Sequence, residues 1–327
     1  MTIQQLEAIC AIARNRYNIS AAAEILQRSQ SGLSRSVKEL ETELGTQIFL
    51  RTRNKVFGLT PQGERLLRIG QRILQDVKTM EQVAGDSVAD NTGDIRIATN
   101  HTHARYVLPG IVKEFTRVFP RITLALQQCD PGQCRDLIAA GDADVGISTI
   151  AAKPADSIVT IPVYRLPRCI VVPQGHPLTY EKNLTLEKLA KFRLISNHTA
   201  FAGRSIIEES FSREGLKPVI ACSVTDTDVC KTYVEIGLGI AVLATVAFNQ
   251  TVDRGLVGLD ASHLFRSSIL NLVLRRHGYL NQPLESFLSV FAPHIHRELL
   301  LKALDGANID TELLSQRAPV ATQQLKS

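Results

Sequence analysis

Apolar side chains recur every three or four positions through the first 45 residues, and this spacing predicts three short helices. The first stripe contains Ile3, Leu6, Ile9, Ile12 and Ala13. The third stripe contains Leu33, Val37, Leu40 and Leu44. Between them lies an alanine-rich stretch, "AAAEILQ", which Asn18 and Ser20 precede as helix-capping side chains. Gly45 suits the end of the third helix, because glycine readily adopts the left-handed conformation found there.

The face of the third predicted helix opposite its apolar stripe is polar and basic. It presents Gln30, Ser31, Ser34, Arg35 and Lys38. Such side chains bind base edges and phosphates, and the tight turn "QRSQ" makes the second and third helices a candidate helix-turn-helix unit. The pattern leaves one alternative open, which is a small helical bundle whose charged face is only solvated.

Two short extended runs in "TQIFLRTRNKVFGLT" predict a two-stranded wing after the third helix. Arg51, Arg53 and Lys55 fall at its tip, where wing residues of DNA-binding proteins lie near the phosphate backbone or the minor groove. Residues 28–72 hold nine Lys and Arg against four Glu, and the whole chain of 327 residues has a net charge of +5. This local concentration of positive charge indicates a polyanionic partner.

A longer helical stripe begins at Pro61, a residue that suits the first turn of a helix. Its apolar positions are Leu66, Ile69, Ile73, Val77, Met80 and Ala84. The spacing is typical of a helix that packs along a seam against another helix, and an isolated helix of this kind is not stable in water. The seam is filled either by a second subunit or by the remainder of the same chain.

Beyond the polar stretch "SVADNTGD", at residues 87–94, strand-like and helix-like runs alternate. The predicted strands are "IRIAT", "ITLALQQ", "VGIST", "CIVVPQ", "FRLIS", "VIACSV" and "IAVLATV". The predicted helices between them include "PGIVKEFTRVFP", "GQCRDLIAAGD", "SIIEESFSREG" and "DVCKTYVEIGLG". This alternation predicts a mostly parallel α/β sheet.

The stretch "RIATNHTHARYVLP", residues 96–109, places polar side chains where a predicted strand passes into a helix. Free backbone amides at a helix start bind anions, and ligands of α/β sheets lie beyond the carboxyl ends of strands. Asn100, Thr102 and His103 add side-chain donors. We therefore expect a small anionic or zwitterionic ligand here, and a charged His103 would make its binding pH-dependent near neutrality.

A metal site and a catalytic site are the alternatives for this stretch. His101 and His103 are two residues apart, and no Asp, Glu or Cys follows with ligand spacing, so we expect no metal. No GxSxG, P-loop or GxGxxG motif is present, so we expect neither an enzyme nor a bound cofactor. The six cysteines form no CxxC pair, and we interpret them as reduced thiols.

The stretch "AAAEILQRSQSGLSRSVKELETELGTQIFLRTRNKVFGLTPQGERLL" resembles the N-terminal domain of LysR-type transcriptional regulators. The resemblance extends to about residue 300. It implies a winged helix-turn-helix domain at 1–60, a dimerisation helix at 61–90 and an effector-binding α/β domain at 91–300, followed by a tail at 301–327. We assign DNA binding to Ser20, Ser29, Gln30, Ser31, Ser34, Arg35, Lys38, Arg51, Arg53 and Lys55.

The resemblance also implies a fold and partners for the second part of the chain. The effector domain resembles periplasmic binding proteins, with subdomain I at about 91–163 and 268–300 and subdomain II at about 164–267. The two connections would fall near "TIPVYRLP" and "LFRSSILN". The implied partners are double-stranded promoter DNA, a second subunit bound through the linker helix, a homotetramer, and RNA polymerase.

Within this family, "IATNHTHARYVLP" resembles the "IATTHTQARYxLP" of the CysB branch, which comprises cysteine-regulon activators and the sulfonate-related regulator Cbl. The resemblance implies control of sulfur assimilation and cysteine biosynthesis by sulfate, O-/N-acetylserine or adenosine phosphosulfate. We assign effector binding to Asn100, His101, Thr102, His103, Thr149, Ala202, Gly203 and Thr225. Asn100, His103 and Ala202 depart from the branch, so the protein is either a paralogue for another sulfur compound or a drifted version of the same pocket.

The beginning of the chain, "MTIQQLEAIC", lacks a basic segment followed by an apolar stretch, and no apolar run reaches membrane-spanning length. We therefore expect a bacterial cytoplasmic protein with no membrane partner. This expectation also disfavours an exported solute-binding protein, which the basic N-terminal part disfavours independently.

Overall fold

The computed structural model describes residues 1–52, 55–85, 92–149, 157–198 and 201–307. The chain forms two compact units, Met1–Val88 and Ala89–Ser327. Arg53, one of the predicted DNA-binding residues, lies outside the described residues. In the described part of the chain, no helix is both long enough and apolar enough to cross a lipid bilayer.

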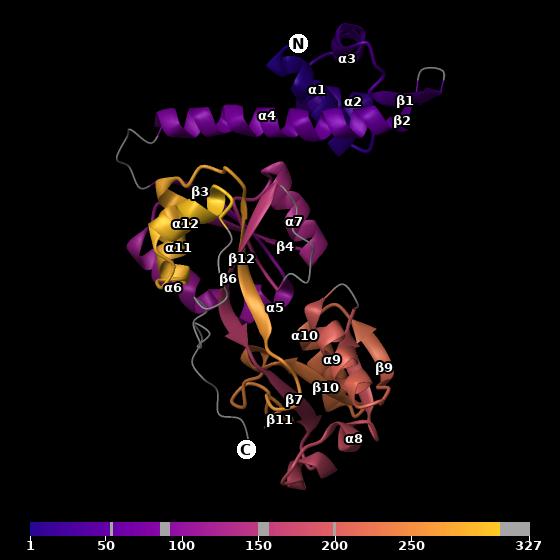
Figure 1. The fold of residues 1–327 in the computed structure, drawn as a ribbon, viewed down its shortest axis with the longest axis vertical. Coiled ribbons are helices and arrows are strands. Elements are labelled where there is room, and N and C mark those ends of the chain that lie inside the picture. The colour runs from indigo at the N-terminus through magenta and orange to yellow at the C-terminus, as the bar shows by residue number, and fades with distance from the viewer. Residues whose placement is uncertain (53–54, 86–91, 150–156, 199–200, 308–327) are drawn as a thin grey trace. The chain divides into compact units, whose positions relative to one another are not determined.

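The first unit contains the three predicted helices and the wing (Figure 1). The helices are α1 (Ile3–Arg14), α2 (Ile19–Ile25) and α3 (Gln30–Leu44). The strands β1 (Phe49–Thr52) and β2 (Lys55–Leu59) pair in antiparallel fashion. Each of the three helices begins at a capping side chain that accepts a backbone N–H, from Thr2, Asn18 and Ser29 respectively.

Two details of the helix prediction need correction. Ser20 lies inside α2, because Asn18 alone accepts the N–H of Ala21 at 3.1 Å. The buried stripe of α3 ends at Leu40, whereas Leu44 is 39% exposed in the last turn. Gly45 caps α3 with φ +63°, as its position predicts.

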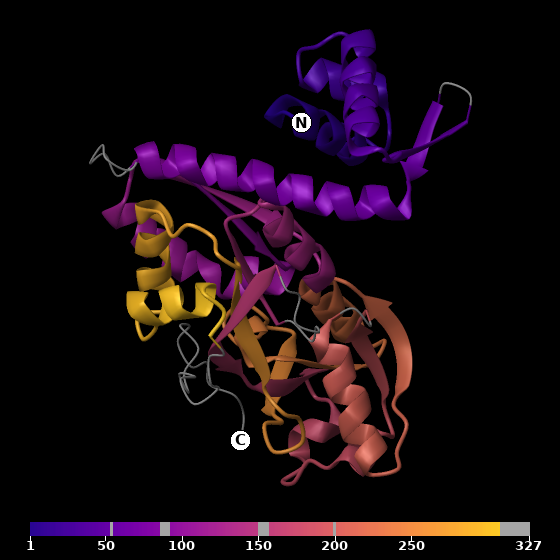
Figure 2. The same cartoon turned by 45° about the horizontal axis from the view of Figure 1, so that its top comes forward.

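The helix α4 (Pro61–Gly85) is continuous over its whole length (Figure 2). Its N-terminal half packs on the core of the first unit through Leu66, Leu67, Ile73 and Leu74. The apolar side chains of Ile69, Met80 and Val83 are 45%, 72% and 51% exposed. The stripe predicted from the sequence therefore has a packed part and an exposed part within this unit.

The second unit contains two five-stranded sheets, one in each subdomain. In subdomain I the strand order is β4-β3-β5-β12-β6, formed by Ile122–Gln128, Gly93–Thr99, Val145–Ser148, Ser268–Arg275 and Ile158–Leu166. In subdomain II it is β11-β7-β10-β8-β9, formed by Leu256–Asp260, Arg168–Pro173, Ile240–Ala244, Arg193–Asn197 and Val219–Val224.

Helices cover these sheets, and each subdomain has its own apolar core (Figure 1). Subdomain I carries α5 (His101–Tyr106), α6 (Leu108–Val118), α7 (Pro131–Ala140), α11 (Gln282–Phe291) and α12 (Arg297–Leu304). Subdomain II carries α8 (Leu186–Leu189), α9 (Ala202–Arg213), α10 (Thr227–Glu235) and the short 3-10 turns η1 (Pro177–Tyr180) and η2 (Thr245–Ala247). The helix α12 crosses the predicted tail boundary at residue 300, because Leu304 belongs to the buried core.

Both sheets are mixed, which corrects the prediction of a mostly parallel sheet. Three neighbouring strands are parallel in each sheet, but β12 pairs antiparallel with β5 and β6, and β7 pairs antiparallel with β10 and β11. The sequence prediction also missed β11. The antiparallel strands arise because the chain crosses between the subdomains twice, from β6 into β7 and back from β11 into β12 (Figure 1).

Candidate effector pocket and DNA-binding surface

A pocket lies between the two subdomains, beyond the carboxyl ends of β3 and β5 in one and of β8 and β9 in the other. It is lined by Asn100, His101, Thr102, His103, Thr149, Leu166, Arg168, Asn197, Phe201, Gly203, Thr225, Thr227, Leu243, Ala244 and Ser268. The structure thus brings together the predicted effector residues from four distant segments. Ala202 alone among them is not part of this lining; it opens α9 beside Gly203.

Asn100 has a structural role at the start of α5. Its Oδ1 accepts the backbone N–H of His103 at 2.9 Å, so one of the amides expected to bind the anion is already satisfied. The helix α5 is only six residues long. The anion site therefore depends less on this helix start than the sequence suggested, and more on side chains around the pocket.

His103 is buried and electrically neutral in this environment, contrary to the expectation of a charge near neutrality. Its side chain is 2% exposed, and its Nδ1 donates to the carbonyl of Ile147 at 3.3 Å. Burial, and to a smaller extent the charge of the nearby Arg168, lower its pKa to about 4. The ring is therefore uncharged at neutral pH, with the proton on Nδ1.

Hydroxyl groups from both subdomains meet in the pocket. Thr102 from α5 and Thr227 from α10 form a hydroxyl–hydroxyl hydrogen bond of 2.7 Å. Thr149 is buried directly after β5, and Thr225 is exposed directly after β9. A ligand between the subdomains would find donors on both walls, as a small polar effector requires.

The sequence prediction missed Arg168, the first residue of β7. Its side chain is 6% exposed, and Nη2 donates to the hydroxyl of Ser268 at the start of β12. Among the described residues, no hydrogen-bond partner meets the Nε of Arg168 or the buried Oδ1 of Asn197. A charged residue opening an otherwise apolar strand, in "PRCIVV", is the sequence signal that could have indicated this position.

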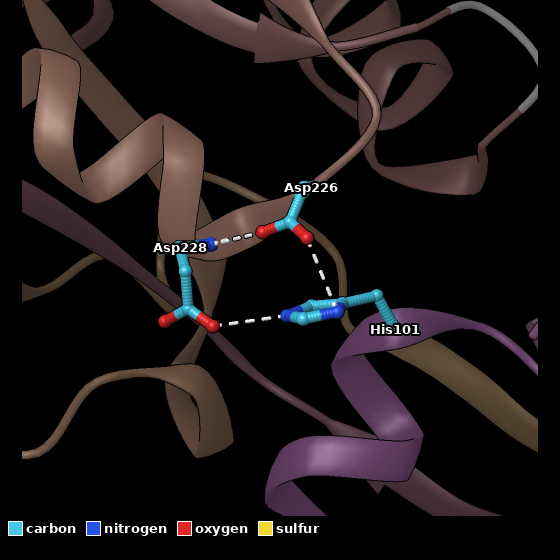
Figure 3. Close-up of side chains that lie close together, drawn as sticks. All are labelled: His101, Asp226 and Asp228. Atoms are coloured by element: carbon cyan, nitrogen blue, oxygen red, sulfur yellow. Dashed lines mark hydrogen bonds and ion pairs between the residues drawn. The ribbon is translucent and has the colours of Figure 1, made fainter.

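His101 lies between two carboxylates of subdomain II (Figure 3). Its Nδ1 is 3.1 Å from Asp226 and its Nε2 is 2.9 Å from Asp228. These three side chains could hold a metal ion, since their ligand atoms lie within 4.8 Å of one another. The sequence prediction considered only nearby residues and missed both aspartates. Without a metal, a ring nitrogen that carries a proton donates to the carboxylate it faces, and the same three side chains then form a hydrogen-bonded contact between α5 and α10.

This contact belongs to a larger set of side chains, which we call the charged bridge. It comprises His101, Arg105 and Tyr106 of α5, Asp226, Asp228 and Lys231 at α10, and Asp253. Arg105 lies 2.6 Å from Asp228, and Tyr106 donates a short hydrogen bond to the same carboxylate. Lys231 donates to Tyr106 at 2.7 Å and to Asp253 at 2.9 Å. The charged bridge therefore joins the subdomains beside the pocket.

Most of the predicted DNA-binding side chains are exposed on the first unit. Ser29, Gln30 and Ser31 are exposed at the start of α3, with Arg35 and Lys38 exposed further along the helix, Ser20 exposed on α2 and Lys55 exposed in the wing. Ser34 is half-buried. Arg51 differs, because its Nη2 is paired with Glu41 at 2.8 Å, and Glu41 also accepts the backbone N–H groups of Ile48 and Phe49. That arrangement fixes the wing to α3.

Comparison with known proteins agrees with this division of the chain. Residues 3–64 match the model of the bacterial regulatory helix-turn-helix protein, lysR family, and residues 89–295 match the LysR substrate binding domain. The chain is 40% identical over 296 residues to the HTH-type transcriptional regulator SsuR of Burkholderia cenocepacia, covering 90% of this chain and 96% of that protein. It is 37% identical to CysB of the same organism over 313 residues, covering 96% and 100%.

The second unit is also similar to a solved structure. The cofactor-binding domain of the Cbl transcriptional regulator superposes with a TM-score of 0.64 at 35% identity, covering 67% of this chain and 96% of that domain. Together, the two family models match both the helix-turn-helix unit and the two-subdomain α/β domain. The chain therefore belongs to the LysR family of transcriptional regulators and is related to the sulfur-linked regulators SsuR, CysB and Cbl.

Proposed function

We propose that this protein is a ligand-responsive regulator of genes for sulfur assimilation and cysteine biosynthesis. The observation that carries the proposal is the pocket between the subdomains, to which the segment around Thr102 and His103 contributes, in a chain whose relatives include CysB and SsuR. Its effector is a small anion or zwitterion of the sulfate, acetylserine or adenosine phosphosulfate class. No catalytic step is part of this function.

Promoter DNA is the partner of the first unit. In this proposal Gln30, Ser31 and Arg35 contact base edges in the major groove and Lys38 and Lys55 contact phosphates, which their exposure supports. Phosphate contacts release counterions, so DNA affinity should fall steeply with salt. Arg51 acts by holding the wing against Glu41.

The exposed apolar side chains of α4 support a dimer formed through this helix. Met80 and Val83 are 72% and 51% exposed, and apolar stripes on long helices are stabilised by a second helix. A dimer would present two reading helices to two half-sites of a promoter. A tetramer of two such dimers, with RNA polymerase as a further partner at the promoter, completes the proposed assembly.

A second candidate function is control of a different sulfur compound. The branch threonine and glutamine that form its pocket are replaced here by Asn100, which caps α5, and by His103, which is buried and neutral. Both replacements alter the donor pattern around the ligand. An organosulfur compound such as a sulfonate is then the effector, with the same DNA-binding mechanism.

The test is a footprint of the purified full chain on genomic fragments of its own bacterium, with and without sulfate, thiosulfate, O-acetylserine, N-acetylserine and adenosine phosphosulfate. We expect protected sites upstream of sulfur genes and a change in protection with one of these compounds. Protection confined to promoters of unrelated pathways, unaffected by every compound, would refute the proposal. Protection at sulfur promoters that responds only to a sulfonate would favour the second candidate.

A further inference from the structure

Arg168 occupies an unusual place, at the junction of both connections between the subdomains. It opens β7 directly after the crossing strand β6, and its guanidinium donates to Ser268, which opens the returning strand β12. Its side chain also lines the pocket. Any group bound to this guanidinium would therefore lie beside the two chain segments that connect the subdomains.

No acidic side chain among the described residues balances the charge of Arg168. No carboxylate of the described residues forms an ion pair with it, and its Nε has no hydrogen-bond partner there, although the residue is 6% exposed. Burial lowers its pKa to about 10, which still leaves the guanidinium charged at neutral pH. Buried charges in proteins are normally paired, so an unpaired one is an incomplete arrangement.

The surroundings leave room for a ligand beside this guanidinium. Gly203 faces it, and a Cβ at position 203 would lie 3.2 Å from Nη1, so the missing side chain leaves space for the guanidinium. The buried Oδ1 of Asn197 belongs to the same lining and has no hydrogen-bond partner among the described residues; as an acceptor it suits an N–H or O–H group of the ligand and not its anion. His103 is neutral and therefore does not supply a competing positive charge.

We propose that Arg168 binds the anionic group of the effector, and that this group is an oxyanion with at least two acceptor oxygens, either a carboxylate or a sulfate or sulfonate. The proposal rests on the effector pocket of the proposed function and adds the residue that gives the pocket its selectivity for charge. A guanidinium presents parallel N–H donors that match such groups in two-point contacts.

The experiment measures binding of sulfate, methanesulfonate and N-acetylserine to the full-length protein by calorimetry at constant ionic strength. We expect the wild type to bind at least one of them and Arg168→Gln to bind it about 30-fold or more weakly, because removing one partner of a buried charge contact has effects of this size. Arg168→Lys should fall between the two, since an ammonium lacks the planar two-point geometry. Arg297→Gln, which removes an exposed arginine paired with Glu285, is the charge-matched control and should bind like the wild type.

A second readout needs no ligand. If Arg168 is an unbalanced buried charge, Arg168→Met should raise the melting temperature of the ligand-free protein, since replacing such a charge by an apolar side chain relieves its desolvation. A lower melting temperature would show a structural role and overturn the proposal, as would unchanged oxyanion binding by Arg168→Gln or no binding of any probe by the wild type. Promoter binding by ligand-free Arg168→Gln separates the two ideas: its retention leaves the regulator function standing even where the role of Arg168 fails.

Discussion

Two cationic side chains on neighbouring parts of the second unit, Lys231 in the charged bridge and Arg168 in the pocket, are both 6% exposed. Burial alone would lower the pKa of Lys231, but the hydrogen bonds that its ammonium donates to Tyr106 and Asp253 raise this pKa above its usual value. The pKa of Arg168 is lowered to about 10 by burial, with no carboxylate to offset it. The two side chains are equally exposed, but their pKa values shift in opposite directions. This difference distinguishes a cation that the fold has paired from one that is left for a ligand.

The same contrast extends to the residues around them. In the charged bridge, the side chains of His101, Arg105 and Lys231 each contact a carboxylate. In the pocket, the described lining residues supply hydroxyl, amide, imidazole and guanidinium groups and no carboxylate. The bridge therefore holds the subdomains in register, while the pocket beside it is complementary to an anion.

The largest expected effect comes from removing a carboxylate that pairs with Lys231. Asp253→Asn removes a carboxylate that is 2.9 Å from Lys231 and also accepts the backbone N–H of Asn249 at 2.8 Å. We expect the free energy of unfolding to fall by about 3 kcal/mol or slightly more, because the buried ammonium loses its buried carboxylate partner and keeps the more exposed Asp228 at 3.3 Å. Urea denaturation followed by circular dichroism measures this change.

The matched control for Asp253→Asn is Glu209→Gln, which removes an exposed carboxylate 3.1 Å from Arg266. Pairs of this kind contribute about 0–1 kcal/mol. Similar small losses in both variants would mean that Lys231 does not depend on its partners, and the contrast with Arg168 would disappear.

A second large effect concerns acid stability through His103. Its pKa is lowered to about 4 when folded and is near 6.5 when unfolded, so the unfolded chain binds the extra proton between these values. Folding is therefore weakened as the pH falls from 6.5 towards 4, by about 3 kcal/mol. Urea denaturation at a series of pH values should show this loss in the wild type and a smaller loss in His103→Gln, whereas equal losses would show that His103 already carries charge in the folded protein.

A smaller effect is expected from crowding the guanidinium without changing any charge. In Gly203→Ala the new Cβ would lie 3.2 Å from Nη1 of Arg168, so the guanidinium has to shift. We expect oxyanion affinity to fall about tenfold, since sub-ångström displacement weakens two-point contacts. Gly110→Ala is the control, because no atom lies within 4 Å of its added Cβ. Equal affinities of the two variants in calorimetry would argue against contact between Arg168 and the ligand.

The smallest effect concerns the wing, which also has one basic side chain that is paired with a carboxylate and one that is exposed. Lys55 is exposed, whereas Arg51 is held by Glu41 at 2.8 Å. Lys55→Gln should reduce the slope of log affinity for promoter DNA against log salt by about 1, with little dependence on sequence. Arg51→Gln should leave this slope nearly unchanged and lower the thermal stability. A smaller slope in Arg51→Gln would instead show that Arg51 contacts DNA.

The local features of the fold follow closely from the sequence. The strands "ITLALQQ" and "VIACSV" have the bounds predicted from their apolar runs, and Gly45 ends α3 where a left-handed residue is required. These features are set by neighbours within a few residues. The polar segment at Asn100 to His103 was likewise identified as pocket-forming, because it follows a strand in an α/β alternation.

The features that the sequence did not reveal depend on contacts between distant segments. Asp228 meets His101 across 127 positions of the chain, so no local spacing rule could pair them. Arg168 is 100 positions from Ser268, and its burial follows from the approach of α9 at Gly203. The charge of His103 was misjudged for the same reason, since its burial against Ile147 is a tertiary property.

The most direct measurement is a crystal structure of the full-length protein grown with saturating sulfate. The account predicts density for the anion in the pocket, with oxygen atoms within hydrogen-bond distance of Nε of Arg168 and of the Thr102 hydroxyl. It would be contradicted by an anion that occupies the pocket while Arg168 keeps Ser268 as its sole partner, or by a carboxylate of the protein found against Arg168.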